Sequence, residues 1–145
     1  MISDTPTAPT LLVVDDDPSI LTILNRFATD QGFDVVTFKT GRAAIEALPS
    51  MHPDAAFIDV GLPDMDGFDL LRQIKVADSR TQVILMTGAT SVNSAVEAIK
   101  AGALDYVPKP FDFERLRDLM MTVRKTMERR ETLMRSEEHT SELQP

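Results

Sequence analysis

Residues 11–20 read LLVVDDDPSI, so four apolar residues lead directly into three aspartates. Neighbouring carboxylates repel each other, by roughly 4 kcal/mol for a pair about 4 Å apart at an effective dielectric near 20. An exposed loop tolerates such a cluster because water solvates the charges. A cluster at the end of a buried strand needs something that balances the charge, and the rest of the chain indicates which situation holds.

Short apolar runs alternate with segments of helical periodicity five times along the chain. The expected strands cover residues 11–15, 34–38, 55–59, 82–87 and 105–107. The expected helices cover about 19–31, 42–48, 68–76, 94–101 and a last stretch from 113 onward. Strands that are apolar almost throughout are typical of parallel sheets covered by helices on both faces. Right-handed crossovers then favour an α/β fold with a doubly wound sheet.

Capping residues mark several of these helix boundaries. Asp17 precedes a proline, which predicts a helix N-cap with proline at the first helical position. This assigns the third aspartate to the helix rather than to a site. Ser94 and Glu97 have capping-box spacing, and Gly32 and Gly102 stand where glycines end helices.

The composition indicates one globular domain. The chain has 145 residues, 43% of them hydrophobic, and its net charge of −8 argues against direct binding to nucleic acid or to an anionic membrane. The absence of cysteine excludes disulfides and thiolate metal sites. No apolar run approaches the roughly 20 residues that span a bilayer. Residues 1–10 lack the features of a signal peptide, so we expect a short flexible leader on a cytoplasmic domain.

Polar side chains follow four of the five predicted strands. Asp15 and Asp16 end the first strand, Asp59 ends the third, Thr87 ends the fourth, and Lys109 closely follows the fifth. In doubly wound sheets, ligands bind outside the carboxyl ends of the strands, near the point where strand order reverses. Charges that are merely solvated have no reason to fall at the ends of so many strands, so we expect these side chains to form one site.

The residue types in this set suit phosphoryl chemistry. Carboxylates without histidine or cysteine favour a hard cation, and Mg²⁺ is typically held by one or two carboxylates, waters and a phosphate oxygen. Lysine provides a mobile positive charge for phosphate, and a threonine hydroxyl donates a hydrogen bond to a phosphoryl oxygen. Aspartate can itself be the nucleophile that forms an acyl phosphate. A bound divalent cation would explain why the fold gathers aspartates at this edge.

Four stretches, in this order and spacing, resemble the receiver domain of bacterial two-component response regulators: VVDDDPSI, FIDVGLPDMDGFDLL, ILMTGAT and DYVPKPF. The resemblance covers about residues 11–123. It implies a flavodoxin-like receiver fold, with five parallel strands in the order 2-1-3-4-5. Residues 88–112 are most similar to receivers of enhancer-binding transcription activators, in which an ATPase module and a DNA-binding module follow. Such an output module is absent from this sequence.

The resemblance also assigns roles in the acidic cluster. Asp59 would be the phosphoacceptor, and Asp15 and Asp16 would form an acidic pair for Mg²⁺. Asp16 would bind the metal directly and Asp15 through water, while Gly61 would supply a backbone carbonyl. Asp64 and Asp66, the two aspartates of LPDMDG (62–67), are expected to be structural.

Three further roles follow from the same resemblance. Thr87 and Lys109 would contact the phosphoryl oxygens, and Tyr106 would change rotamer when Thr87 moves toward the phosphoryl group. The bond between Lys109 and Pro110 would be a cis peptide. The face formed by the helix at 94–101, the last strand and the last helix would change with phosphorylation, with homodimerisation as the expected consequence.

The chain has two histidines, His52 in a predicted loop and His139 near the end, and we expect neither to be a phosphodonor. The domain therefore needs a partner, a sensor histidine kinase or a phosphotransfer protein. We expect a signalling domain rather than an enzyme with its own substrate. Two alternatives remain open: a Mg²⁺-dependent phosphatase with an aspartyl nucleophile, and a degenerate receiver that binds partners without phosphate. The phosphatase motif D-x-D-x-T/V is only partly met by DDDPS.

The last predicted helix carries an apolar stripe that packs on the sheet at its start. The stripe consists of Leu116, Met120, Val123, Met127 and Met134. We assign residues 11–125 to the receiver domain and 126–145 to a linker-helix extension that is able to pair weakly as a coiled coil. Within it, RSEEHTSELQP (135–145) matches the translation of a common sequencing adapter, so we interpret this tail as an artefact of a truncated read.

Overall fold

The computed structural model describes residues 8–89 and 91–143, with side chains described as far as residue 134. Five strands alternate with five helices, as predicted from the apolar pattern. The strands are β1 (Thr10–Val14), β2 (Asp34–Phe38), β3 (Ala55–Asp59), β4 (Gln82–Thr87) and β5 (Asp105–Pro108). The helices are α1 (Pro18–Asp30), α2 (Gly41–Met51), α3 (Gly67–Ala77), α4 (Val92–Lys100) and α5 (Phe113–Leu143).

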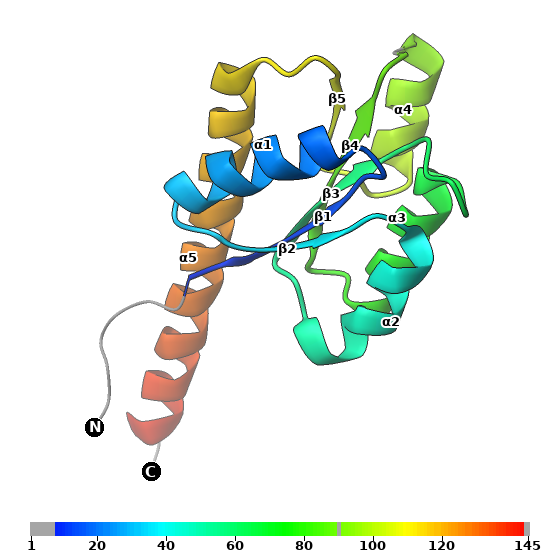
Figure 1. Cartoon of the computed structure of the whole chain (residues 1–145). Coiled ribbons are helices and arrows are strands. Elements are labelled where there is room, and N and C mark those ends of the chain that lie inside the picture. The colour runs from blue at the N-terminus through cyan, green and yellow to red at the C-terminus, as the bar shows by residue number, and fades with distance from the viewer. Residues whose placement is uncertain (1–7, 90, 144–145) are drawn as a thin grey trace.

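All neighbouring strands are parallel, and the sheet order is β2-β1-β3-β4-β5, which confirms the predicted fold class. Successive strand residues point to opposite faces of the sheet, so each strand contributes to two separate cores. Leu11, Val13 and Phe57 pack on the face covered by α1 and α5. Leu12 and Ile58 pack on the face covered by α2, α3 and α4. Figure 1 shows the sheet between these two layers of helices.

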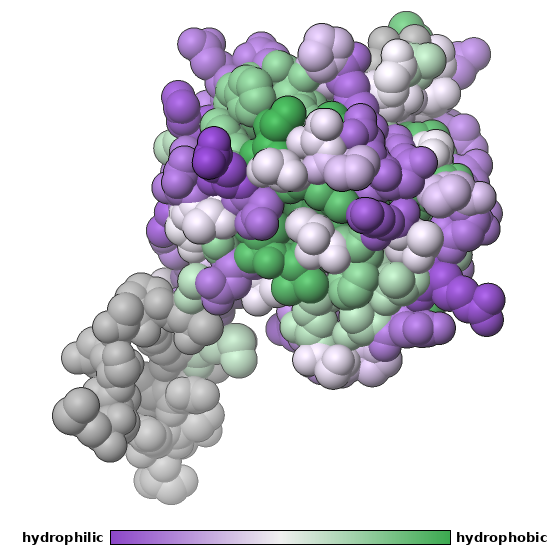
Figure 2. Space-filling view, in the orientation of Figure 1, coloured by the Kyte–Doolittle hydropathy of each residue, from purple (hydrophilic) through white to green (hydrophobic). Residues whose placement is uncertain are grey.

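One edge of the sheet is formed by β2, which pairs only with β1 among the described residues. Val35, Val36 and Phe38 on this strand are half-buried. Figure 2 shows apolar atoms in the middle of this face of the molecule, with polar residues around them. The carboxyl ends of β1 and β3, which lie next to each other inside the sheet, are the place where strand order reverses.

Most of the predicted caps are present. Asp17 is the N-cap of α1 and accepts a hydrogen bond of 2.9 Å from the backbone N–H of Ser19. Gly32 and Gly102 have φ angles of 92° and 101°, the left-handed conformation that favours glycine after a helix. The predicted cap at Ser94 is wrong, because α4 begins one turn earlier with Ser91 as its N-cap.

Ser91 and Ser94 explain this error. The Ser91 hydroxyl accepts a hydrogen bond of 3.1 Å from the Ser94 backbone N–H, so Ser94 occupies the third position of the helix. Helix α2 also differs from its prediction, since it continues to Met51 with Pro49 inside it. A proline in the last turn removes only one backbone hydrogen bond there, and the helix ends at His52, whose φ is 47°.

Helix α5 is much longer than the other helices and extends beyond the body of the domain (Figure 1). Leu116, Met120 and Val123 are buried against the sheet, as the apolar stripe predicted, while the side chain of Met134 is exposed. The helix passes residue 125 without interruption, so the predicted boundary of the domain lies within a continuous helix. The origin of residues 135–145 stays a prediction.

At the other end, residues 1–7 of the predicted leader lie outside the described residues, and Thr10 already belongs to β1. Within the part of the chain that the structure describes, no helix combines the length and the apolarity needed to cross a bilayer.

Candidate functional site

The three predicted carboxylates meet at the carboxyl ends of β1 and β3. Asp15, Asp16 and Asp59 each offer a carboxylate oxygen, and these oxygens lie within 4.8 Å of one another. Asp15 is fully buried and Asp59 nearly so, whereas Asp16 is exposed. The set contains only oxygen donors, which fits a hard divalent cation such as Mg²⁺. The site is therefore accessible to an ion through Asp16.

Lys109 balances part of this negative charge. Its Nζ donates a hydrogen bond of 2.5 Å to Asp15 Oδ2 and lies 3.3 Å from Asp59 Oδ1. The backbone N–H of Lys109 donates to the carbonyl of Thr87 at 2.8 Å, which ties the end of β5 to the end of β4. The peptide bond between Lys109 and Pro110 is cis, as the family resemblance implied.

Burial and pairing act against each other at this charge cluster. Burial raises the pKa of Asp15 above its ordinary value, although the hydrogen bonds from Lys109 and from the Asp17 backbone oppose the change. Burial would lower the pKa of Lys109, but its hydrogen bond to Asp15 and the charges of Asp15 and Asp59 together raise it. Lys109 therefore stays positively charged at neutral pH and can attract an anion to this edge.

The loop between β3 and α3 holds Asp59 through its backbone. The Gly61 N–H donates a hydrogen bond of 3.2 Å to Asp59 Oδ1. The Gly67 N–H donates to the Val60 carbonyl at 2.9 Å, and a Cβ at Gly67 would collide with the Asp59 carbonyl oxygen. The role of Gly67 was missed in the sequence, where the only signal is a glycine directly after the aspartate cap.

Asp64 and Asp66 of LPDMDG, which were expected to be structural, each accept hydrogen bonds at the start of a helix. Asp66 is the N-cap of α3 and accepts a hydrogen bond of 2.9 Å from the Phe68 N–H. Asp64 accepts hydrogen bonds of 2.9 Å from the backbone N–H groups of Gly41 and Arg42 at the start of α2. Both side chains therefore serve the elements that frame the site.

Thr87 is buried at the end of β4, but its hydroxyl is engaged by its own loop. It donates a hydrogen bond of 3.0 Å to the Ala89 carbonyl and accepts one of 3.1 Å from the Ala89 N–H. The side chain of Tyr106 is also buried, and its hydroxyl donates to the same Ala89 carbonyl at 3.4 Å. Tyr106 is therefore buried in this structure, and its expected change of rotamer after Thr87 moves stays a prediction.

With this geometry in place, the family of the chain follows from comparison. Residues 11–121 match the family model described as "Response regulator receiver domain". The chain belongs to this family. The sheet order and the acidic cluster are therefore those of a receiver domain of a two-component system, which is a signalling fold rather than a classical enzyme family.

Relatives of known function resemble the receiver domain over most of its length. It is 40% identical over 106 residues to the regulatory protein AtoC of Escherichia coli, an overlap that covers 73% of this chain and 23% of AtoC. It is 42% identical over 102 residues to the DNA-binding transcriptional regulator NtrC of Klebsiella pneumoniae, covering 70% of this chain and 22% of NtrC. The matched region spans about a quarter of the length of these relatives.

Solved receiver structures agree with the fold. The signal receiver domain of a putative LuxO repressor protein from Vibrio parahaemolyticus has a TM-score of 0.81 at 31% identity, covering 88% of this chain and 98% of that one. The beryllofluoride-activated receiver domain dimer of NtrC4 has a TM-score of 0.75 at 35% identity, covering 79% and 94%.

Proposed function

We propose that this receiver domain accepts a phosphoryl group on Asp59 from a phosphohistidine of a partner kinase or phosphotransfer protein, with Mg²⁺ bound at the acidic cluster. The observation that carries this proposal is the meeting of three carboxylates and Lys109 at one edge of the sheet. The exposed position of Asp16 leaves the cluster open to a large donor.

The hydrogen bonds favour Asp59 over Asp15 as the nucleophile. Both oxygens of Asp15 accept hydrogen bonds, Oδ1 from the Asp17 N–H and Oδ2 from Lys109, and the side chain has no exposed surface. Asp59 Oδ1 accepts from Gly61, whereas the structure gives no hydrogen bond to its Oδ2 among the described residues. An Asp59 oxygen would attack phosphorus as the phosphorus–nitrogen bond breaks, and the electron pair of that bond would return to the imidazole.

The metal would be held by Asp16 and Asp59, with Asp15 acting through water and Gly61 through its carbonyl. Mg²⁺ would neutralise the charge that accumulates when a carboxylate meets an anionic phosphoryl group. Lys109, already beside Asp59, would contact a phosphoryl oxygen through a charge-assisted hydrogen bond. The Thr87 hydroxyl would leave the Ala89 carbonyl and donate to a second phosphoryl oxygen.

The output of the switch would pass through α4 and the neighbouring β5 and α5. Three apolar side chains on α4 are exposed at helical spacing, Val92 at 80%, Val96 at 47% and Ile99 at 54%. The chain's similarity to the activated NtrC4 receiver dimer supports homodimerisation as the response. Because the relatives AtoC and NtrC are regulatory proteins about three times as long as this chain, we infer that a transcriptional output module follows in the full-length protein.

Acetyl phosphate with Mg²⁺ tests this function directly. Intact-mass measurement should show the addition of one phosphoryl group to the parent chain and to the control Asp69→Asn, which alters an exposed aspartate on α3. Asp59→Asn should show no addition. A phosphorylated Asp59→Asn chain would overturn the assignment, unmodified parent protein would favour a phosphate-independent receiver, and turnover of free phosphomonoesters would favour a phosphatase.

A further inference from the structure

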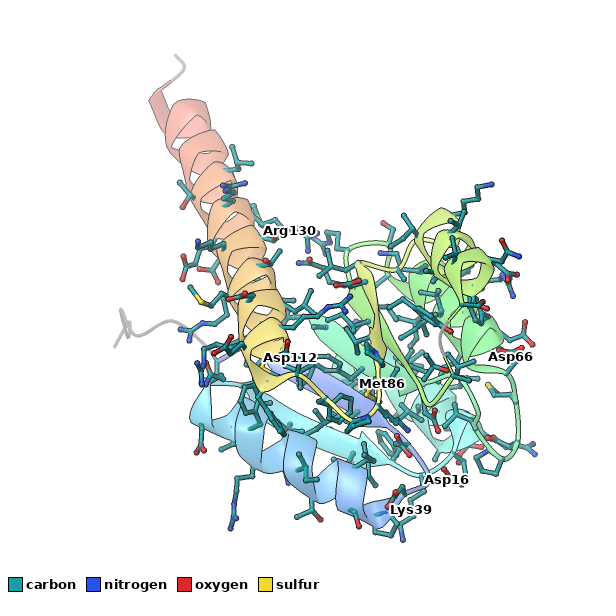
Figure 3. All side chains as sticks on the ribbon, turned by 90° about the horizontal axis from the view of Figure 1, so that it is seen from above. Asp16, Lys39, Asp66, Met86, Asp112 and Arg130 are labelled. Carbon is teal, nitrogen blue, oxygen red and sulfur yellow. The ribbon has the colours of Figure 1, made fainter. Side chains whose placement is uncertain are left out.

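Helix α5 is attached to the domain at the edge where the strands begin, which lies opposite the acidic cluster. We call this the amino edge and define it by the loop after α1 (residues 31–33) and the loop before β4 (residues 78–81). Arg124 Nη1 donates a hydrogen bond of 2.8 Å to the carbonyl of Gln31. Arg130 Nη1 donates a hydrogen bond of 3.0 Å to the carbonyl of Arg80. Figure 3 shows Arg130 on α5, far from Asp16.

The hydrogen bond from Arg124 gives the Gln31 carbonyl a donor at the end of α1. Gln31 is the C-cap of α1, and carbonyls at the end of a helix lack intrahelical partners and carry a partial negative charge. A guanidinium supplies both a donor and a positive charge at that position. The guanidinium of Arg124 also lies against Gly32, where a Cβ would come within 3.2 Å of Nη1. The absent side chain at this turn makes room for the arginine.

The second contact lies beside another cation. Lys75 Nζ donates hydrogen bonds to the carbonyls of Ser79 and Thr81, on either side of the Arg80 carbonyl that accepts from Arg130. The pKa of Lys75 is lowered, first by burial and then by the positive charge of Arg130. Arg130 is nevertheless half-buried, and Met127 one turn earlier packs on the core under α5. Met127 and Arg130 line a pocket together with Thr81 from the amino edge and Pro53 from the loop before β3. This part of α5 is therefore in contact with the domain, although it lies beyond the predicted boundary at residue 125.

We propose that Arg124 and Arg130 fasten α5 to two separate loops of the amino edge, so that the helix leaves the receiver as a fixed rod and not as a flexible linker. Leu116, Met120 and Val123 already hold the first turns of α5 on the sheet, and the two arginine contacts extend this attachment to the part of the helix that follows. The folded unit then extends to about residue 131. Any module joined to α5 would receive its orientation from the receiver through this helix.

Hydrogen–deuterium exchange of the full chain tests the proposal. The double variant Arg124→Ala/Arg130→Ala should exchange its amides at residues 126–131 roughly tenfold faster than the parent. Alanine has a higher helix propensity than arginine, so the substitutions alone would slow exchange. Arg129→Ala is the matched control, because Arg129 is exposed and makes no hydrogen bond or ion pair among the described residues. Unchanged exchange in the double variant, or equal acceleration in Arg129→Ala, would overturn the proposal.

A distance measurement gives an independent result. The chain has no cysteine, so Ser50→Cys on α2 and Thr132→Cys on α5 can carry one spin label each without further changes. The parent background should give one narrow distance distribution by pulsed electron paramagnetic resonance, and the double arginine variant a broad one. Singly labelled chains identify distances between molecules. A broad distribution in the parent background would show that α5 is not fixed.

Discussion

The charges at the acidic edge depend on one another for their ionisation states. Asp15 has no exposed surface, and it is held in place by Lys109 and by the backbone of Asp17. Lys109 in turn keeps its charge because it lies between Asp15 and Asp59. Asp16 is the exception, since it is exposed and the structure gives its carboxylate no hydrogen bond among the described residues. It is thus the carboxylate best placed to bind a metal from solution.

Removing the charge of Asp16 should therefore weaken metal binding. We expect Asp16→Asn to lower the affinity for Mg²⁺ by roughly tenfold or more, measured by isothermal titration calorimetry. Asp17→Asn is the matched control, because it removes a neighbouring charge while asparagine still caps α1. An unchanged affinity in Asp16→Asn would mean that the metal ligands lie elsewhere.

The close approach of Gly67 to the end of β3 gives a second prediction. Gly67→Ala should lower the free energy of unfolding by about 1–3 kcal/mol, since its methyl group would push against the backbone of Asp59 and Val60. Gly61→Ala is the control, because a Cβ at Gly61 meets no atom within 4 Å. Urea unfolding of the three chains measures the difference, and equal loss in both variants would refute the steric explanation.

At the scale of single elements, the start of α2 depends on a side chain from a distant loop. Asp64 supplements the N-cap Thr40 by accepting hydrogen bonds from the Arg42 and Gly41 backbones, and these bonds lower the pKa of Asp64. The folded pKa lies below the unfolded value near 3.8, so the stabilisation is fully present above that value. It is lost as the pH falls through the folded pKa.

The lowered pKa of Asp64 predicts how the stability of an Asp64 variant changes with pH. Asp64→Ala should be less stable than the parent at neutral pH, and the difference should shrink as the pH falls below 3.8. Urea unfolding at a series of pH values measures it. Asp118→Ala, which alters an exposed aspartate of α5, should show no such pH-dependent difference. A constant difference between Asp64→Ala and the parent at all pH values would exclude a contribution from the charge.

The elements show what could and could not be predicted from the sequence. The strands were predicted almost residue by residue, because they are apolar almost throughout and both faces of the sheet are covered. The start of α4 was not predicted correctly. Ser91 and Ser94 are both residues that favour the N-cap position, and only the folded structure decides between them. Helix α2 passed through Pro49, although the sequence predicted an end there, because a final turn survives the loss of one hydrogen bond.

For the molecule as a whole, the meeting of the candidate site residues at one edge was predictable and the attachment of α5 was not. The aspartates, Thr87 and Lys109 each follow a strand, so the sheet topology alone brings them to one edge. The hydrogen bonds of Arg124 and Arg130 join residues 93 and 50 positions apart, and their acceptors are backbone carbonyls. Every residue has a backbone carbonyl, so the sequence does not indicate which one accepts such a bond. The engagement of Thr87 by Ala89 was hidden for the same reason.

Signal transmission across the whole molecule can be tested by sedimentation. Beryllofluoride with Mg²⁺ should change the self-association of the parent chain, because the exposed apolar side chains of α4 lie on the face that is expected to respond. Thr87→Ala should be phosphorylated on Asp59 but lose this change, since it lacks the hydroxyl that would leave Ala89. Analytical ultracentrifugation of both chains, with and without the phosphate mimic, measures the effect. Identical sedimentation of the parent in both states would rule out a dimer switch in this chain.

The burial of Tyr106 has a practical consequence for observing this molecule. The chain contains one tyrosine and no tryptophan, so its absorption near 280 nm and the emission excited at that wavelength arise from a single ring. That ring lies beside the Ala89 carbonyl that Thr87 also holds. Departure of the Thr87 hydroxyl would alter the polarity around the phenol, and the intrinsic optical signal of the protein would record the event without any added dye.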